Sequence, residues 1–470
     1  MSCRAWHVSV RLVAFRALVC ALLLCAVLFL AAPARATVAP AKPNLIFVLS
    51  DDQRAGTLSV MPATRADFNI GLNGFVTTPL CAPSRSSLLT GQYAHNTRVL
   101  TNKDYPAMQA REAESIGPWL QAQGYYTGFV GKYINKYSID DPTPPGWDEF
   151  RALVWQTDGR PIGDVFTSWE MREHFFDGTT MHDELVSYPN PQYPNAYSTR
   201  VIAGDAARFI AHAANPQYNP NGKPWALFVW TTAPNGVHPE SRYADAWVPP
   251  WHPPPSFMEA NMSDKPIEVR HAVDITNNVA TLRRWYAGQY RDLYSVDDLV
   301  DRVFNAVDDN AFTANTYGIY MSDNGRFLGE HRLQRKRLAY EEGIRVPLRI
   351  HIPGHAPENI PQLAANIDIA PTLLDWAGDP SIHNANGTSL VPLINGTATT
   401  WRTNLLIENW EQYHYHALRT NRYTYIRWSH THHQELYDLL HDRYQLRNIA
   451  HQHPIIDAKL RARMKALERS

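Results

Sequence analysis

The stretch Cys81–Gly91, CAPSRSSLLTG, is the feature around which the rest of the chain makes sense. Pro83 has a fixed φ that suits the first turn of a helix, and residues 84–90 are compatible with helix, so we predict a helix that starts just after Cys81. Free amides and the dipole at a helix N-terminus favour an anion beside residue 81, and Arg85, one turn on, adds a guanidinium. An isolated Cys-x-Pro would indicate only a buried structural cysteine.

The first 36 residues have the layout of a cleaved secretory signal. Three arginines precede an apolar run over residues 17–32, and Ala34-Arg35-Ala36 supplies a small-x-small site before Thr37. A retained membrane anchor is the alternative, although the run is at the short end for crossing a bilayer. We expect an exported protein, periplasmic or secreted, with no stable membrane association.

Cysteine and charge counts narrow the class of function. Three of the four cysteines lie in the leader, so the remainder keeps only Cys81, and a lone thiol in an exported chain is a candidate reactive group. The leader holds four basic residues and no acidic one, which takes the formal net charge from −1 for the chain to −5 for the remainder. A mildly acidic surface without a basic tail argues against nucleic acid as a partner.

Two apolar stretches, far apart in the sequence, each end in a pair of oxygen-bearing side chains. Asn44–Ser50, NLIFVLS, has the length of a buried strand and precedes Asp51-Asp52, and Thr316–Ser322, TYGIYMS, precedes Asp323-Asn324. A lone Asp-Asp suits a turn or a cap. Two such strand ends instead favour one cage, because ligands gather at the carboxyl ends of parallel strands and paired carboxylates repel without a cation. Oxygen ligands suit Ca²⁺, or Mg²⁺ in a small cavity.

Cys81–Gly91 also resembles the sulfatase signature C-x-P-S-R-x-x-L-L-T-G at every specified position. The resemblance is to the formylglycine-dependent sulfatases of the alkaline-phosphatase-like superfamily, where a formylglycine-generating enzyme converts the cysteine to an aldehyde whose hydrate is the nucleophile. It implies a sulfuric ester hydrolase. Its metal ligands match the modified Cys81 and four further residues, for which we expect Ca²⁺: Asp51, Asp52, Asp323 and Asn324.

Two lysines and an asparagine resemble the family where it contacts the sulfate. Lys132 follows a strand predicted over residues 126–130 and matches one sulfate-contacting lysine, and Lys336 matches the other, with a solvated run of charge as the alternative. Asn135 stands where many members have a histidine, which resembles the glucosamine-6-sulfatase branch. Because Asn cannot accept a proton near neutral pH, the sequence leaves open which residue acts as the base that breaks down the sulfated intermediate.

Four histidines are weighed as further site residues. His238, after a strand predicted over residues 225–230, is the nearest match to the family's Pro-His-x-Pro element, displaced by a few residues. The resemblance makes it the donor of a proton to the leaving alcohol, and a loop histidine without function is the alternative. Three others have no carboxylate or cysteine at ligand spacing, and we interpret them as an exposed loop: His430, His432 and His433.

The predicted architecture is α/β, with a large, mostly parallel central sheet flanked by helices and a smaller antiparallel C-terminal subdomain. The predicted boundaries are a signal peptide over 1–36, a catalytic domain over 37–380 and a subdomain over 381–470. Residues 140–195, rich in Pro, Gly and aromatics, are interpreted as long loops and short hairpins at the mouth of the site. Helices are predicted over 116–124, 197–213 and 279–305, and we interpret Trp285 in the last as core packing.

Three functions follow from these residues. The first is a sulfatase for a sulfated small molecule or carbohydrate, and the second uses the same site on phosphate or phosphonate esters. The third is a non-catalytic binding protein with the sulfatase fold, which has no need of an oxidisable thiol beside a metal cage. We predict the first, with the metal and Arg85 holding the nucleophile made from Cys81. The predicted substrate contacts are Lys132, Asn135, His238 and Lys336.

Overall fold

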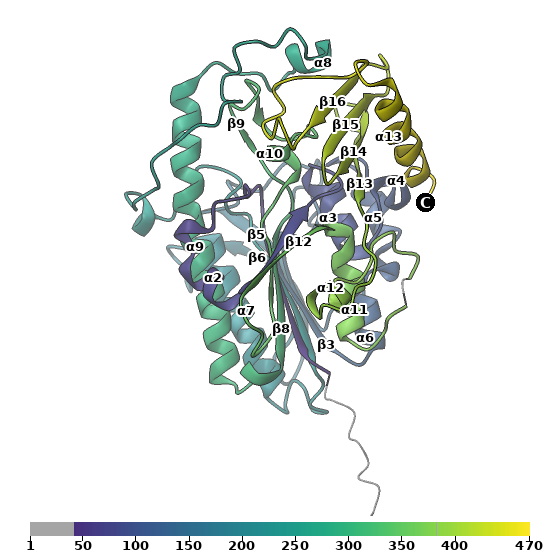
Figure 1. Ribbon diagram of the computed structural model, residues 1–470. Helices are drawn as coiled ribbons and strands as arrows, with labels where there is room; N and C mark the ends of the chain where they lie inside the picture. Colours follow the sequence, from purple (N-terminus) through teal and green to yellow (C-terminus); the bar gives the residue numbers. More distant parts are fainter. Residues whose placement is uncertain (1–41, 382) are drawn as a thin grey trace, which may run out of the picture. The chain divides into compact units, whose positions relative to one another are not determined.

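The central sheet of the protein has ten strands, in the order β12-β2-β11-β8-β1-β7-β3-β4-β5-β6 (Figure 1). The computed structural model describes residues 42–381 and 383–470, so the leader predicted over residues 1–36 lies outside the described residues. The middle of the sheet is parallel and consists of the four predicted apolar strands, each confirmed to within one residue: β1 (Asn44–Ser50), β3 (Tyr126–Gly131), β7 (Trp225–Trp230) and β8 (Thr316–Ser322).

The sheet extends further than the sequence indicated. Residues 140–195 supply three of its strands, β4 (Glu149–Leu153), β5 (Trp169–Phe176) and β6 (Met181–Tyr188). The predicted hairpins are present, because β5 pairs antiparallel with both β4 and β6, but the interpretation missed that they extend the central sheet. β6 is the edge strand and is largely exposed, which removes the apolar alternation that would have revealed it. The other edge and its neighbours are β2 (Ile70–Phe75), β11 (Leu348–His351) and β12 (Glu358–Ala365).

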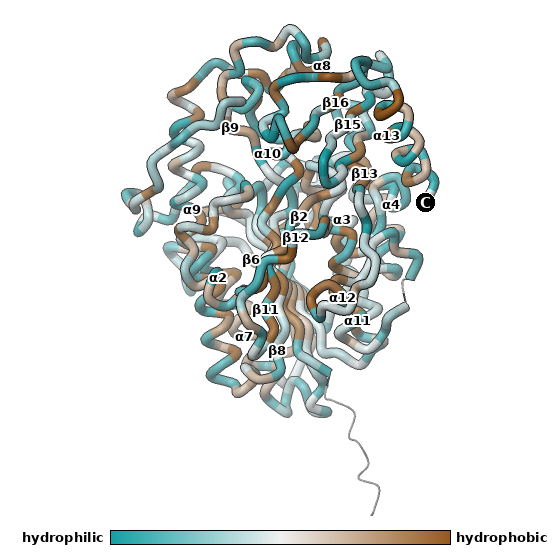
Figure 2. The backbone as a smooth tube through the Cα atoms, in the orientation of Figure 1, coloured by the Kyte–Doolittle hydropathy of each residue, from teal (hydrophilic) through white to brown (hydrophobic). Residues whose placement is uncertain are grey.

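Each face of the sheet carries a hydrophobic layer. Along β1, Leu45, Phe47 and Leu49 belong to one buried cluster and Ile46 and Val48 to the other, as expected for the period of a strand. Figure 2 shows apolar residues along these central strands. The second cluster includes residues of α7 (Ser198–Ala214) and α9 (Val279–Asp309). The first includes residues of α3 (Cys81–Thr90), α6 (Ile116–Ala122) and α11 (Ile369–Trp376). The predicted helices are confirmed.

Shorter elements connect these layers. The short helices are α2 (Pro62–Asp67), α4 (Ala94–Thr97), α5 (Tyr105–Gln109), α8 (Ile267–Arg270), α10 (Glu341–Ile344) and α12 (Val391–Ile394). A two-stranded antiparallel sheet pairs β9 (Phe327–Leu328) with β10 (Gln334–Arg335). No helix in the part of the chain that the structure describes is both long and apolar enough to cross a bilayer.

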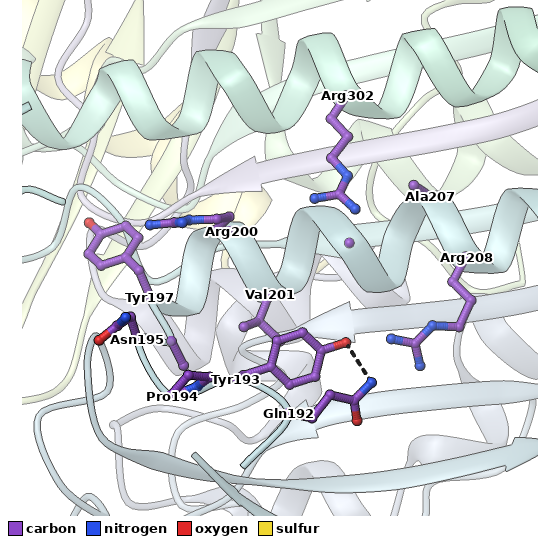
Figure 3. Close-up of a pocket in the computed structure, with 12 residues that line it drawn as sticks. Gln192, Tyr193, Pro194, Asn195, Tyr197, Arg200, Val201, Ala207, Arg208 and Arg302 are labelled. Carbon is purple, nitrogen blue, oxygen red and sulfur yellow. Dashed lines mark hydrogen bonds between the residues drawn. The ribbon is translucent and has the colours of Figure 1, made fainter. Parts of the chain in front are cut away.

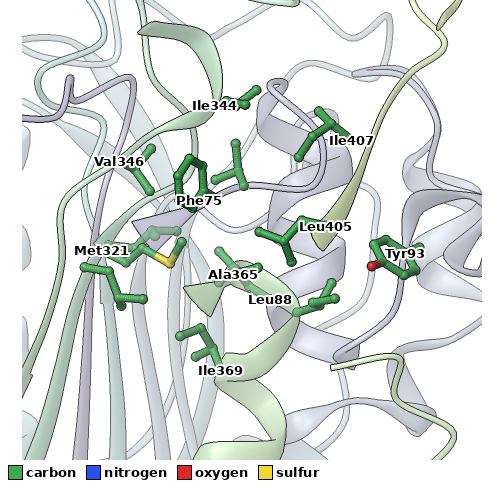
Figure 4. Packing of buried hydrophobic residues seen from close by; sticks show 14 of the residues in the cluster. Phe75, Leu88, Tyr93, Met321, Ile344, Val346, Ala365, Ile369, Leu405 and Ile407 are labelled. Carbon is green, nitrogen blue, oxygen red and sulfur yellow. The ribbon is translucent and has the colours of Figure 1, made fainter. Parts of the chain in front are cut away.

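The C-terminal part forms a separate four-stranded antiparallel sheet, as predicted. Its strands are β13 (Asn404–Asn409), β14 (Tyr415–Thr420), β15 (Tyr423–Trp428) and β16 (Gln434–Asp438), and α13 (Pro454–Leu467) packs on β14 and β15. Leu405 and Ile407 of β13 join the same buried cluster as Phe75 and Leu88 (Figure 4). The loop that holds His430, His432 and His433 is exposed, as predicted. The domain boundary near residue 380 stays a prediction.

Candidate active site

Cys81 is the first residue of α3, one position earlier than predicted. It is a free, buried cysteine with 2% of its surface exposed. The amide of Ala82 donates to Asn102 Oδ1 at 2.9 Å, which satisfies one of the open donors of the first turn. Burial, reinforced by the Asp51 carboxylate, raises the pKa of the Cys81 thiol to about 12, so the unmodified thiol stays protonated at neutral pH.

The parallel pairing of β1 with β8 brings the two acidic strand ends together. Ser50 lies opposite Ser322 in the register, so the residues that follow them emerge side by side. Asp52 adopts a left-handed backbone with φ of 63°, and its amide donates to Asp323 Oδ1 at 3.0 Å. Four buried side chains offer ligand atoms that all lie within 4.8 Å of one another: Asp51, Asp52, Cys81 and Asp323.

This cage fits a hard divalent cation. Its three carboxylates are fully buried at a spacing where like charges repel. Asn324 donates from Nδ2 to Asp52 Oδ1 at 2.6 Å, while its own Oδ1 is buried and has no hydrogen-bond partner among residues 42–381 and 383–470. That oxygen is therefore available to a ligand. Carboxylate and amide oxygens are the donors that Ca²⁺ and Mg²⁺ prefer.

Arg85 crosses the cage from one turn into α3. Its Nε donates to Asp323 at 2.9 Å and its Nη2 to Asp51 at 3.2 Å, which ties the ends of β8 and β1 together. Its Nη1 donates to the backbone carbonyl of Lys132 at 2.6 Å, and the guanidinium lies 5.3 Å from the ring centroid of Trp230. Because these charges are fully buried, loss of one partner leaves another uncompensated. Arg85 therefore orders the cage.

The two predicted lysines also converge here. Lys132 pairs with Asp51 and Lys336 pairs with Asp52, and Lys336 Nζ lies 2.9 Å from Cys81 Sγ. Burial lowers the pKa of each lysine, but the adjacent carboxylate outweighs it and leaves the pKa raised. Both side chains are therefore charged beside the cysteine, although Lys336 is 255 residues from Cys81 in the sequence.

A cavity of about 270 Å³ opens over Cys81 and is lined by predicted site residues, among them Asn135 and Lys336, together with residues that the sequence did not assign to the site. Trp285 is half-buried and lines it, so the interpretation of this residue as core packing was wrong. Arg326 also lines it, donates to Asp52 Oδ2 at 2.7 Å, and holds its guanidinium 3.9 Å from the ring centroid of Trp285. The position of Arg326, two residues after Asn324, was the available signal.

His238 does not line the cavity over Cys81. An adjoining cavity of about 290 Å³ shares Asn135 with the first and is lined by Lys132 and His238. The exposed His238 ring stacks on Phe166 at 5.0 Å between centroids, and within the described range it contacts no other predicted site residue through a hydrogen bond. Asn135 Oδ1 is buried and unpaired among the same residues, which leaves it free to accept from a ligand.

A larger cavity of about 550 Å³ lies between α7 and α9 and is lined by none of the predicted site residues (Figure 3). Arg200, Arg208 and Arg302 line it, and Arg200 and Arg208 already pair with Glu240 and Asp205. Its size alone does not make it a reactive site. The predicted cage residues instead meet at the carboxyl ends of β1 and β8.

Comparison with known proteins identifies this arrangement. A model of the sulfatase family matches residues 43–379. The chain belongs to the sulfatase family. A second model, described as the C-terminal part of N-sulphoglucosamine sulphohydrolase, matches residues 329–470 of this sulfatase. The family inferred from the signature at Cys81 is confirmed.

Relatives of this chain support the glucosamine-6-sulfatase branch, which the sequence around Asn135 also resembles. A Drosophila melanogaster extracellular sulfatase SULF-1 homolog is 33% identical over 394 residues, which cover 78% of this chain and 33% of the relative. The Capra hircus N-acetylglucosamine-6-sulfatase is 30% identical over 394 residues, or 78% of this chain and 66% of the relative. The chain thus spans from one third to two thirds of these relatives.

The fold is also confirmed by a solved structure. A protein in complex with its substrate D-glucosamine-2-N,6-O-disulfate superimposes with a TM-score of 0.73 at 21% identity. The match covers 91% of this chain and 98% of that protein, so it includes both the large mixed sheet and the small antiparallel one.

Proposed function

We propose that this sulfatase hydrolyses a sulfate ester of a carbohydrate and releases an alcohol and inorganic sulfate. The observation that carries the proposal is convergence: the signature cysteine, three carboxylates and two lysines from distant segments meet in one buried cage. A sulfated carbohydrate is supported by the N-acetylglucosamine-6-sulfatase among the relatives and by the disulfated sugar bound to the solved neighbour. Export is part of the proposal and is supported by the extracellular relative.

Two groups complete the proposed site. Asp51, Asp52, Asp323 and Asn324, with residue 81, would hold a divalent cation, for which the oxygen donors favour Ca²⁺. When bound, such a cation draws negative charge from the sulfate oxygens. Conversion of Cys81 to formylglycine by a formylglycine-generating enzyme supplies a hydrated aldehyde as the nucleophile.

The remaining residues have distinct roles in this proposal. Lys132 and Lys336 hold buried ammonium groups at the cage, where they stabilise negative charge on sulfate oxygens. Asn135 lies at both cavities and accepts a hydrogen bond from a substrate hydroxyl. The alcohol part of the ester extends into the adjoining cavity, where His238 protonates the departing oxygen.

The test is sulfate release by protein made together with a formylglycine-generating enzyme. Glucosamine 6-sulfate and 4-nitrophenyl sulfate are compared with 4-nitrophenyl phosphate and a phosphonate monoester. We expect turnover of the sulfates, and a loss of about 10²-fold to 10³-fold in kcat in Lys336→Ala, the range seen when one stabilising donor is removed. Arg302→Gln, at the unrelated cavity, serves as the control and should leave kcat unchanged.

Two results would contradict the proposal. Preferred turnover of phosphate or phosphonate esters would assign the same site to the second chemistry. Failure to turn over any of the four esters, with residue 81 modified and Ca²⁺ supplied, would favour the third function, a non-catalytic binding protein with the sulfatase fold.

A further inference from the structure

We infer that the substrate carries a second anionic group near the sulfate that is cleaved, and that Arg335 binds this group. The inference rests on the proposed function and narrows its substrate to sulfated carbohydrates that bear another sulfate or a carboxylate. It concerns the outer part of the cavity over Cys81, which the reacting groups do not use.

The first observation is an unusual backbone. Arg335, Lys336 and Arg337 are consecutive, and all three line the cavity over Cys81. In a regular strand successive side chains point to opposite faces, so three in a row cannot face one space. Arg335 and Arg337 have left-handed backbones, with φ of 67° and 93°. Such conformations are uncommon for residues other than glycine and cluster at functional sites, where the surrounding structure enforces them.

The second observation is that the inner cations of this cavity already have partners. Lys336 pairs with Asp52 and lies 2.9 Å from Cys81 Sγ, so it faces the reacting centre. Arg326 donates to the other oxygen of Asp52 at 2.7 Å. Both side chains are nine-tenths buried or more, and both serve the cage.

The two outer cations of the cavity, Arg337 and Arg335, differ from the inner ones and from each other. Arg337 donates to Asp274 at 3.2 Å and lies 3.6 Å from Glu411, so two carboxylates hold it. Arg335 Nε lies 3.8 Å from the same Asp274, and its side chain makes no hydrogen bond within residues 42–381 and 383–470. Its side chain is 62% exposed. Arg335 is thus a guanidinium at the rim of the reactive cavity that is available to a ligand.

A second anion on the same substrate fits this position. The cleaved sulfate is served by Lys132, Lys336 and the cation, so Arg335 has no part in holding it. A guanidinium presents paired donors that match the oxygens of a sulfate or a carboxylate. An arginine that only solvates the surface does not need a place at the mouth of the cavity.

The test compares two substrates that differ by one charge, D-glucosamine 6-O-sulfate and D-glucosamine-2-N,6-O-disulfate, with the full chain after maturation and with Ca²⁺. We expect the wild type to prefer the disulfate in kcat/KM by about five-fold, through KM, which is the size of a partly exposed ion pair. Arg335→Gln should abolish the preference and Arg335→Lys should retain part of it. Arg302→Gln makes the same charge change at another cavity and should keep the full preference.

The arms of the experiment separate the possible results. A third substrate, a 6-O-sulfated disaccharide with a uronate in place of the N-sulfate, shows which anion Arg335 binds. If only this disaccharide is preferred over D-glucosamine 6-O-sulfate, the anion is a carboxylate. If only the disulfate is preferred, the anion is a sulfate. An equal kcat/KM for all substrates in the wild type, or a preference that survives Arg335→Gln, overturns the inference.

A binding measurement keeps the inference separate from the proposed function. Calorimetric titration of Cys81→Ser with the disulfate reports the contact without turnover. About five-fold weaker binding when Arg335→Gln is added supports the role of Arg335, even if no ester is hydrolysed. Equal binding in the two variants refutes it, even if the enzyme is active.

Discussion

Lys132 reaches the cage because the residue before it is a glycine. At Gly131, with φ of 118°, a Cβ would lie 1.8 Å from the carbonyl oxygen of Trp230. The amide of Lys132 donates to that same oxygen at 2.8 Å, so β3 stays paired with β7 up to the lysine. A side chain at position 131 would therefore separate the two strands at the site itself.

We expect Gly131→Ala to be far more damaging than Gly124→Ala. Gly124 also has a positive φ, 85°, but nothing lies within 4 Å of a Cβ added there. Both variants carry backbone strain, and only Gly131→Ala adds a clash, worth about 1–3 kcal/mol as in other over-packed sites. Urea denaturation and kcat measure the two effects. Equal losses in the two variants would contradict this role for Gly131.

Glu112 links stability to pH without involving the cage. It is buried, Tyr105 donates to it at 2.9 Å, and burial raises its pKa from 4.5 to about 7. Because the folded state then binds the proton more tightly than the unfolded state, stability falls as pH rises from about 4.5 through 7. Glu112→Gln should match the wild type near pH 4.5 and exceed it by at most about 3 kcal/mol at pH 8. Urea midpoints at both pH values test this, and an equal difference at each would contradict it.

The sequence predicted the site residues that belong to recognisable motifs. It did not predict the residues that reach the cavity through an unusual backbone conformation. The signature and the acidic pairs identified Cys81 and its ligands because each motif is contiguous. Arg335 and Arg337 line the cavity only because their backbones are left-handed, and a left-handed arginine has no sequence signal. For the same reason a solvated surface stayed the alternative for the basic run around Lys336, although the flanking residues favoured a site.

At the scale of elements, the start of α3 depends on the C-terminal sheet. Asn102 caps the amide of Ala82, and the amide of Asn102 donates to Glu411 at 2.9 Å. Glu411 lies between β13 and β14 and is also 3.6 Å from Arg337. One carboxylate thus connects the small sheet to the nucleophile helix and to the rim of the cavity.

Glu411→Ala should therefore destabilise the protein by about 1–3 kcal/mol, since it leaves the Asn102 amide and Arg337 short of a partner. Glu114→Ala is the matched control, because Glu114 has 75% of its side chain exposed and only a 3.9 Å contact with Arg111. That variant should stay within about 0.5 kcal/mol of the wild type. Similar small effects in both variants would show that Glu411 does not support α3.

Elements differed in how far the sequence could predict them. β1 and β8 were predictable because each is an unbroken apolar run buried on both faces. β6 was not, because an exposed edge strand has little apolar pattern. Helical periodicity predicted α9 but not the role of Trp285, since spacing does not show which turn of a 31-residue helix leaves the core and meets the cavity.

For the whole molecule, sheet order builds the site. β1 lies between β7 and β8, which places residues 51 and 323 at one edge although 271 residues separate Asp52 from Asp323. The sequence predicted two acidic strand ends, and the tendency of ligands to gather at the carboxyl ends of parallel strands supplied the expectation that they meet. Their adjacency itself is a property of the strand order, which local patterns do not encode.

Removal of Ca²⁺ should lower the melting temperature by a few degrees. A cation that binds only the folded cage stabilises it by about 2.7 kcal/mol at a concentration one hundred times its Kd. Thermal unfolding with EDTA, and again after Ca²⁺ or Mg²⁺ is restored, measures this for the matured protein. Asn324→Ala should weaken the response, since it removes the unpaired ligand oxygen. A melting temperature that changes neither with EDTA nor with added Ca²⁺ or Mg²⁺ would contradict the proposed metal site.

The central claim is that Cys81 becomes the nucleophile, and one measurement tests it most directly. The mass of the peptide that carries Cys81 is determined in protein made together with a formylglycine-generating enzyme, alongside its reactivity toward an aldehyde reagent. We predict an aldehyde in place of the thiol, at this residue alone. An unmodified thiol in protein that still hydrolyses sulfate esters would contradict the account.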